Sequence, residues 1–316
     1  MLTTLLVFVV AAFLAFALTP LVRTLSVRIG AIDAPGGRKI HTRSTPRLGG
    51  VAIVAAGSLA LAIAAAMDRS MAAPVGGGAG VAVILGALVV FAAGVLDDIR
   101  GVGATAKLAA IGGAALLVPA AGILIHHVTL FGHAYELGWM AGPMTFAWIV
   151  VVTNAFNLID GLDGLATGLA IIAAATCGVV LLARHDLPNA RVLVALVGAG
   201  VGFLPYNFNP ATIFLGDCGS LIFGFVLAVT AITGWQKGAT ALAVGVPILV
   251  LALPIADVVG SIARRVAGHR PVLAADQRHI HHWLLRRGFS HRAAVLVLYA
   301  CALVLAALAV MTADLH

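Results

Sequence analysis

The chain has 316 residues, of which 62% are hydrophobic and only 10% are charged, and its formal net charge is +7 at pH 7. Soluble domains carry roughly 25% charged residues, so this composition excludes a soluble globular protein and indicates an integral membrane protein with many spans. Membrane topology and attraction to anionic lipids or nucleotides explain the basic excess, and we expect no nucleic-acid partner.

Apolar runs of about 20 residues recur along the whole chain, and each is long enough to cross a hydrocarbon core of ~30 Å as a helix. Helices also satisfy their own backbone hydrogen bonds in lipid. We therefore expect one all-α transmembrane domain over residues 1–316, with about ten spans. The first run has no basic residue before it and is too long for a signal-peptide core, so we expect it to stay in the mature protein. The expected spans are 2–22, 48–67, 78–96, 104–125, 142–157, 163–183, 190–206, 219–235, 239–262 and 293–312.

Basic residues predict the orientation of these spans. Six Lys and Arg residues lie between positions 23 and 47, and seven Arg residues lie between 264 and 292. By the positive-inside rule, the loops after the first and ninth spans should face the cytoplasm. With ten spans, the loops after the third, fifth and seventh spans share that side, and both chain ends lie outside.

The chain has only twelve carboxylate side chains, and five of them fall in three short motifs at the ends of apolar runs: Asp97-Asp98, Asp160 with Asp163, and Asp217. All three motifs lie on the predicted cytoplasmic side. An acidic side chain at a membrane boundary loses hydration, so a cluster of such groups needs a counter-cation. The pattern therefore predicts one site at the cytoplasmic face, where a divalent metal ion and phosphates meet.

Each acidic motif also has a structural interpretation. Asp97-Asp98 is compatible with an ordinary helix end, although adjacent carboxylates repel one another unless a cation lies beside them. Asp163 opens one apolar run and Asp217 precedes another, and Asp is a good N-cap residue at the start of a helix. Glycines on both sides of Asp217 would also allow a phosphate or metal ion to approach the backbone closely. Capping and ligand binding are compatible roles.

Histidines gather between the ninth and tenth spans, where His279, His281 and His282 fall within four residues. Imidazoles beside several arginines suit phosphate binding, and a zinc site stays an alternative on spacing alone. Asp257 lies apart from the acidic motifs, within the ninth expected span. We expect it to point toward Arg264 and Arg265 and to orient the loop, with a functional role as the alternative.

Five segments, at 41–50, 97–98, 154–164, 214–217 and 279–282, occur in an order that resembles the polyprenyl-phosphate N-acetylhexosamine-1-phosphate transferase family along nearly the whole chain. The His-Ile-His-His-Trp-Leu-Leu tract is similar to the branch that transfers GlcNAc-1-phosphate, which includes the initiating enzymes of O-antigen, enterobacterial common antigen and wall teichoic acid synthesis. The related muramoyl-pentapeptide branch usually has three consecutive histidines followed by Phe-Glu. Ile280, Trp283 and Leu284 depart from that pattern.

The resemblance implies that the chain transfers an N-acetylhexosamine 1-phosphate from its UDP-sugar to a polyprenyl phosphate in a bacterial plasma membrane. The products would be UMP and the first lipid-linked sugar of a cell-envelope polysaccharide. Mg²⁺ would be the cofactor, with Mn²⁺ as an alternative ion, and a homodimer is implied as well. Phospho-MurNAc-pentapeptide transfer is the alternative reaction. An ion-coupled transporter is the rival class, but transporters place their coupling acids near the bilayer midplane rather than at one surface.

The resemblance also implies roles for particular residues. Asp97, Asp98 and Asp217 would be the catalytic and metal-binding residues, with Asp217 as the principal ligand and Asp97 orienting the nucleophile. Mg²⁺ needs only one or two carboxylates when substrate phosphates complete its shell. We expect direct attack rather than a phospho-enzyme, because a phosphate monoester is largely dianionic at neutral pH. The implied substrate-binding residues are His41, Arg43, Asn157, Asp160, Asp163, Asn207, Phe214, His279, His281 and His282.

Overall fold

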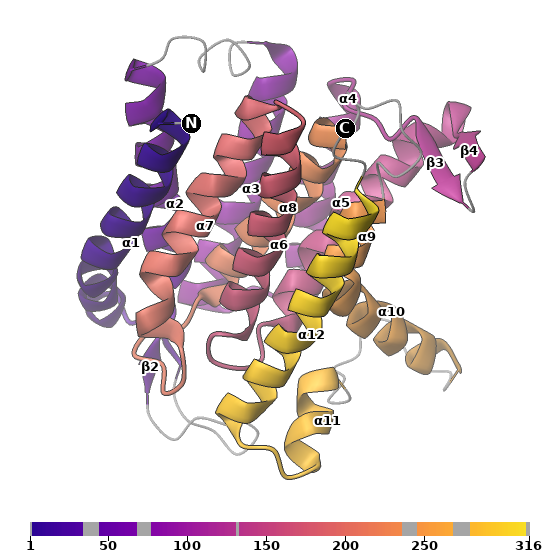
Figure 1. Cartoon of the computed structure of the whole chain (residues 1–316). Coiled ribbons are helices and arrows are strands. Elements are labelled where there is room, and N and C mark those ends of the chain that lie inside the picture. Colours follow the sequence, from indigo (N-terminus) through magenta and orange to yellow (C-terminus); the bar gives the residue numbers. More distant parts are fainter. Residues whose placement is uncertain are drawn as a thin grey trace.

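The computed structural model describes residues 2–33, 44–67, 77–130, 133–235, 245–267 and 279–313. Most of these residues lie in helices that run side by side as a bundle (Figure 1). The helices are α1 (Leu2–Arg28), α2 (Gly49–Met67), α3 (Gly78–Arg100), α4 (Ala104–Ala120), α5 (Ala141–Ile159), α6 (Leu165–Ala183), α7 (Leu187–Asn207), α8 (Gly216–Trp235), α9 (Gly245–Val250), α10 (Ala252–Ala267), α11 (Ile280–Arg286) and α12 (His291–Thr312), with a 3₁₀ turn at Gly138–Met140.

Two short antiparallel strand pairs complete the described structure. Strands β1 (Ile32–Asp33) and β2 (Thr45–Pro46) pair at one end of the bundle, and β3 (His127–Leu130) and β4 (His133–Glu136) form a hairpin beside the other end (Figure 1). The first and last described residues also lie at the end opposite β2 and α11 (Figure 1). The side of the membrane that each end faces stays a prediction.

Eight helices of the described residues are long and apolar enough to cross a membrane, namely α1, α2, α3, α5 with its preceding 3₁₀ turn, α6, α7, α8 and α12. The prediction of an all-α polytopic membrane protein is therefore confirmed. The count of ten spans is not reached in the described part of the chain. The fourth expected span is represented by the shorter apolar helix α4.

The ninth expected span, 239–262, is not one helix. Residues 239–244 lie outside the described part, and the remainder is divided into α9 and α10 at Leu251. Pro254 explains the division, because it has no N–H to donate to the carbonyl of Val250, whereas proline is well tolerated in the first turn of a new helix. After the break, α10 leans away from the bundle axis (Figure 1).

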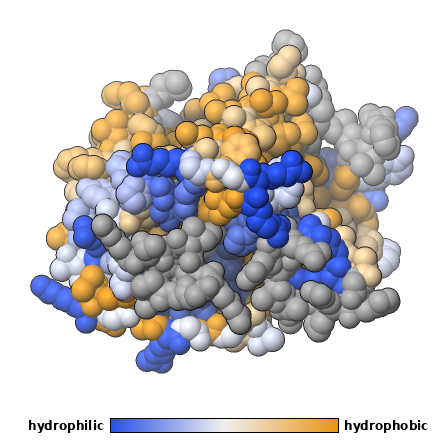
Figure 2. Space-filling model, turned by 90° about the horizontal axis from the view of Figure 1, so that it is seen from below, coloured by the Kyte–Doolittle hydropathy of each residue, from blue (hydrophilic) through white to orange (hydrophobic). Residues whose placement is uncertain are grey.

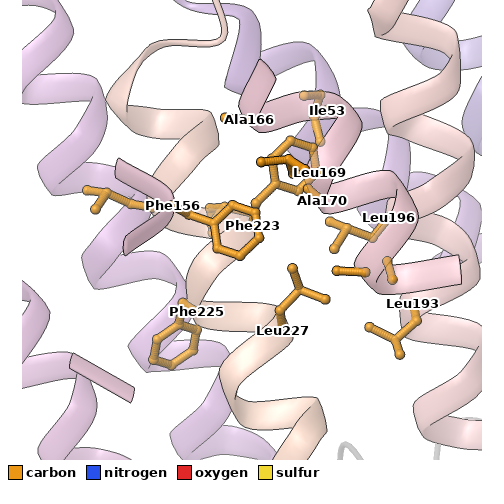
Figure 3. Close-up of a cluster of buried hydrophobic side chains, with 14 of the residues drawn as sticks. Ile53, Phe156, Ala166, Leu169, Ala170, Leu193, Leu196, Phe223, Phe225 and Leu227 are labelled. Carbon is orange, nitrogen blue, oxygen red and sulfur yellow. The ribbon is translucent and has the colours of Figure 1, made fainter. Parts of the chain in front are cut away.

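Helix α8 lies innermost in the bundle. In the most apolar 18-residue stretch of α8, 83% of the residues are buried, whereas the corresponding share in α3 is 17%. Helix α8 is therefore enclosed by protein, while α3 presents most of its surface outward. Phe223 and Phe225 of α8 are fully buried. Phe223 lies in a cluster with Phe156 of α5, Leu169 of α6 and other apolar side chains (Figure 3). Close packing of this kind stabilises the position of α8 against its neighbours through van der Waals contacts.

Two glycines let neighbouring helices touch the start of α8. A β-carbon at Gly94 of α3 would lie 2.4 Å from the Cα of Cys218, and one at Gly50 of α2 would lie 2.2 Å from the backbone nitrogen of Gly219. Small residues at such crossings allow helix backbones to approach closely in a membrane. The carboxyl end of α3 is thereby held beside the first turn of α8.

We expect Gly94→Ala to destabilise the protein by roughly 1–3 kcal/mol, because the added methyl group would overlap backbone atoms that no rotamer change can move. Thermal unfolding of the purified protein in detergent measures the effect. Gly113→Ala in α4 is the matched control, since a β-carbon there meets no atom within 4 Å. Equal unfolding temperatures for the two variants would contradict the packing described above.

Candidate functional site

The polar motifs meet at the end of the bundle that carries β2 and α11. Figure 2 shows this end from below, where hydrophilic residues cross the middle of the face and hydrophobic residues gather along one side. A cavity of about 700 Å³ opens here. Its lining includes Asp33, Thr45, Arg47, Asp97, Asp98, Asp160, Asp163, Asn207, Asn209, Phe214, Asp217, His282 and His291. The five acids of the three sequence motifs therefore share one cavity.

Asp97 and Asp217 converge on one cation, Lys107. The Nζ atom of Lys107 lies 3.1 Å from Asp97 Oδ2 and also contacts Asp217 Oδ2. The three side chains come from α3, α4 and α8, and each is mostly buried. Lys107 belongs to none of the motifs that the sequence pattern singles out. A signal was available, because an ionisable residue inside an apolar helix is by default a functional candidate.

Asp98 anchors the start of α8. Its Oδ1 accepts the backbone N–H of Asp217 at 2.9 Å, and its Oδ2 accepts that of Cys218 at 3.0 Å. These amides belong to the first helical turn, which needs acceptors from outside the helix. Gly216 precedes them with φ of +75°, and a β-carbon there would meet Asp98 Oδ2 at 2.5 Å. The Asp98 carboxylate therefore binds the backbone of α8 and orients the Asp217 side chain toward Lys107.

Asp163 joins three segments around the cavity. Its Oδ2 accepts from Asn209 Nδ2 and from the Ala211 N–H, both at 3.0 Å, and its own N–H donates to His291 Nε2 at 2.8 Å. The alternative in which Asp163 caps α6 is wrong, because Gly164 occupies the N-cap position with φ of +82°. The Asp163 side chain instead ties the loop after α5 to the loop after α7.

The two predicted asparagines make contacts between helices. Asn157 Nδ2 donates to Ser220 Oγ at 3.1 Å, which links α5 to α8, and Asn157 is not among the residues that line the cavity. Asn207 is buried, accepts from Thr167 Oγ1 at 2.7 Å and donates to the Ile213 carbonyl at 3.2 Å. Both amides therefore support the cavity wall.

Asp160 and Phe214 line the cavity directly. Burial, reinforced by three neighbouring carboxylates, raises the pKa of Asp160 well above its usual range. The backbone of Phe214 is fixed on both sides, since its N–H donates to the Pro46 carbonyl and its carbonyl accepts from Gly49. The predicted residues His41 and Arg43 lie outside the described residues.

The three histidines predicted to bind substrate have different surroundings. His282 lines the cavity. His281 is 1% exposed and packs on the loop after α5, where a β-carbon at Gly161 would lie 2.3 Å from its Nε2. His279 Nδ1 lies 2.8 Å from Asp257 Oδ2. Asp257 therefore contacts His279, and the expectation that it points to the two arginines of α10 is wrong.

We expect His281 to make the protein less stable in acid. Burial and the neighbouring His282 lower the pKa of the His281 imidazole from 6.5 to about 3, so the unfolded chain binds this proton more readily than the folded chain. The contribution of the neutral ring to the free energy of unfolding is complete above about pH 6.5. It decreases as the pH falls toward 3, by up to ~1.4 kcal/mol per pH unit. Unfolding temperatures from pH 7.5 to 5 should fall less steeply in His281→Asn than in the wild type. His126→Asn, the same exchange at an exposed position, is the matched control.

A metal ion in this cavity would need several oxygen donors close together. Within the described ranges, no group of three or more His, Cys, Asp or Glu side chains is arranged to hold one, which includes the histidine tract. Asp97 and Asp217 nevertheless bring two carboxylate oxygens to one point, while Asp98 is engaged by the backbone of α8. Two carboxylates and substrate phosphates form a usual magnesium site, so the residues present fit Mg²⁺.

Residues 81–235 match the model of Glycosyl transferase family 4. A protein of Bacillus subtilis (strain 168), named a probable undecaprenyl-phosphate N-acetylglucosaminyl 1-phosphate transferase, is 38% identical over 297 residues, covering 92% of this chain and 80% of that protein. The chain belongs to glycosyl transferase family 4. The family resemblance seen in the sequence motifs is thereby confirmed.

Two further relatives help to place the chain. A decaprenyl-phosphate N-acetylglucosaminephosphotransferase of Mycolicibacterium smegmatis is 35% identical, covering 92% of this chain and 77% of that protein. A phospho-N-acetylmuramoyl-pentapeptide-transferase of Listeria monocytogenes is 32% identical over 219 residues, covering 64% of this chain and 65% of that protein. The similarity to the N-acetylglucosamine-phosphate transferases is higher and extends over more of the chain.

Proposed function

We propose that this member of the family transfers N-acetylglucosamine 1-phosphate from UDP-GlcNAc to a polyprenyl phosphate, in the plasma membrane of a bacterium, and releases UMP. The observation that carries the proposal is the convergence of Asp97, Asp217 and Lys107 in a cavity at one end of a membrane-type helix bundle. At such a place a water-soluble nucleotide and the headgroup of a membrane lipid can meet.

In the proposed reaction, an oxygen of the polyprenyl phosphate attacks the phosphorus that carries the sugar. The bond from that phosphorus to the bridging oxygen breaks, and the electron pair leaves with UMP. Bound Mg²⁺ would offset the charge that develops on the diphosphate. Asp97 and Asp217 would hold the ion, and Lys107 would place a positive charge beside the same phosphates.

Other residues of the chain prepare the cavity for these substrates. Asp98 keeps the first turn of α8 in place, so the Asp217 carboxylate needs no reorganisation when substrate arrives. Asp160 has a raised pKa, which favours a protonated side chain that donates a hydrogen bond to a phosphate or sugar oxygen. His282 contributes a further donor at the cavity wall. Phe214 offers an aromatic surface for the uracil ring.

The purified protein in detergent tests the proposal when it is supplied with UDP-GlcNAc, undecaprenyl phosphate and Mg²⁺, with UMP release as the measurement. We expect release that stops with EDTA and returns with Mg²⁺ or Mn²⁺. If no UDP-hexosamine led to UMP release, the proposed transferase activity would be overturned. A preference for UDP-MurNAc-pentapeptide would assign the chain to the muramoyl branch, and a radiolabelled phospho-enzyme would contradict direct attack.

Orientation and assembly need separate measurements. The basic residues near the cavity support a cytoplasmic location, and labelling of single cysteines in intact cells and in inverted vesicles tests it. The homodimer stays a prediction from the family resemblance. Its test is the mass of the protein in a detergent micelle.

A further inference from the structure

Asp257 lies on α10, outside the residues that line the cavity of the candidate site. Its side chain is only 4% exposed, and both of its oxygens are occupied. Oδ2 lies 2.8 Å from His279 Nδ1, and Oδ1 accepts the Ile280 N–H at 2.8 Å. These two groups belong to the residue before α11 and to its first residue. One carboxylate on α10 therefore holds the beginning of another helix.

Helix α11 depends on this contact because it is short. It has seven residues, and its N-cap residue, His279, makes no capping hydrogen bond with its own side chain. A helix of two turns is marginal by itself, and its first N–H groups need acceptors. Asp257 supplies such an acceptor from a different helix, so the place where α11 begins is set by α10.

The position of α11 decides which histidine reaches the cavity. His281 is packed against Gly161, and the ring of His282 follows at a centroid distance of 4.3 Å. Successive side chains on a helix point about 100° apart. A rotation of α11 by one residue would therefore turn His282 away from the cavity and move His281 off Gly161.

We propose that Asp257 is a positioning residue of the transferase site. Through His279 and the Ile280 amide it fixes the start of α11 so that His282 faces the cavity, and the ring of His279 serves this contact rather than the substrate. The inference rests on the proposed function and adds to it a residue that acts through His282 and from outside the cavity.

A double-mutant cycle tests the proposal, with kcat/KM for UDP-GlcNAc measured in the wild type, Asp257→Ala, His282→Ala and the double variant. Each single variant should lose about 10- to 100-fold, as expected for a misplaced or missing contact. The double variant should lose no more than His282→Ala, because Asp257 acts through that side chain. Losses that multiply would indicate a general structural role and would overturn the proposal.

Controls separate positioning from misfolding. Asp257→Asn keeps one oxygen acceptor, so it should recover part of the activity that Asp257→Ala loses. Glu136→Gln, an exposed carboxylate on β4 at the other end of the bundle, should behave as the wild type. The amount of folded protein for each variant is taken from size-exclusion chromatography in detergent, and turnover is expressed per folded molecule.

Hydrogen exchange followed by mass spectrometry gives a readout that needs no activity. In Asp257→Ala the amides of α11 should exchange at least ~10-fold faster, while those of α12 stay unchanged. Unchanged exchange in α11 would overturn the positioning role even if the wild type is an active transferase. Absence of UMP release from the wild type would instead remove the proposed function, and the exchange of α11 would still decide whether Asp257 anchors it.

Discussion

Asp217→Asn is expected to lower kcat for UMP release by about 10²- to 10³-fold, while the protein remains folded. The carboxylate that meets Lys107 and would bind the metal ion is lost, whereas the backbone N–H of residue 217 still donates to Asp98. An amide also cannot replace a carboxylate as a strong magnesium ligand. The measurement is UMP release over a range of Mg²⁺ concentrations.

The Glu136→Gln variant is the matched control for Asp217→Asn, because both changes remove one negative charge and keep the shape of the side chain. Its turnover and its unfolding temperature should equal those of the wild type. If Asp217→Asn kept full turnover with an unchanged dependence on Mg²⁺, the site described here would not be the site of metal-assisted transfer.

Lys107→Met is expected to lower kcat/KM by about 10²-fold and to lower the unfolding temperature as well. Methionine fills a similar volume without the charge, so Asp97 and Asp217 would face each other without their common cation. Removing one partner of a mostly buried ion pair leaves an uncompensated charge, which costs stability. UMP release and thermal unfolding in detergent measure the two effects.

Lys107→Arg separates these two contributions. It keeps the positive charge, so the unfolding temperature should return most of the way to the wild-type value. Turnover should recover less, because the guanidinium is larger and differs in geometry from an ammonium. A Lys107→Met variant with wild-type turnover would show that the cation serves the fold of this region and not the reaction.

Much of the fold and of the site could be predicted from the sequence, for a simple reason. In a chain with so few charges, apolar runs mark the helices, and acids at their ends are conspicuous. Asp97, Asp98, Asp160, Asp163 and Asp217 were found in this way, and the structure places them around one cavity. Lys107 gives a weaker signal, because it stands alone in an apolar helix and belongs to no acidic or histidine motif.

Contacts between distant residues could not be predicted, because they depend on how helices cross. Asp257 and His279 are 22 residues apart, and no periodicity in the sequence pairs them. The three histidines are neighbours in the sequence, but of these three only His282 lines the cavity. Successive side chains on α11 point in different directions, because each residue of a helix is rotated by about 100° from the one before. The break between α9 and α10 was readable in principle, since Pro254 interrupts the apolar run.

The bonds from Asp98 to α8 have a consequence for how this site could be altered. The Asp98 carboxylate accepts from main-chain N–H groups, which every residue type except proline has. The anchoring of the helix therefore depends on Asp98, whereas the proposed transfer chemistry depends on Asp217. An engineered histidine or glutamate at position 217 would keep the same anchoring, so the ligand set of the proposed metal site is open to redesign while the helix stays in place.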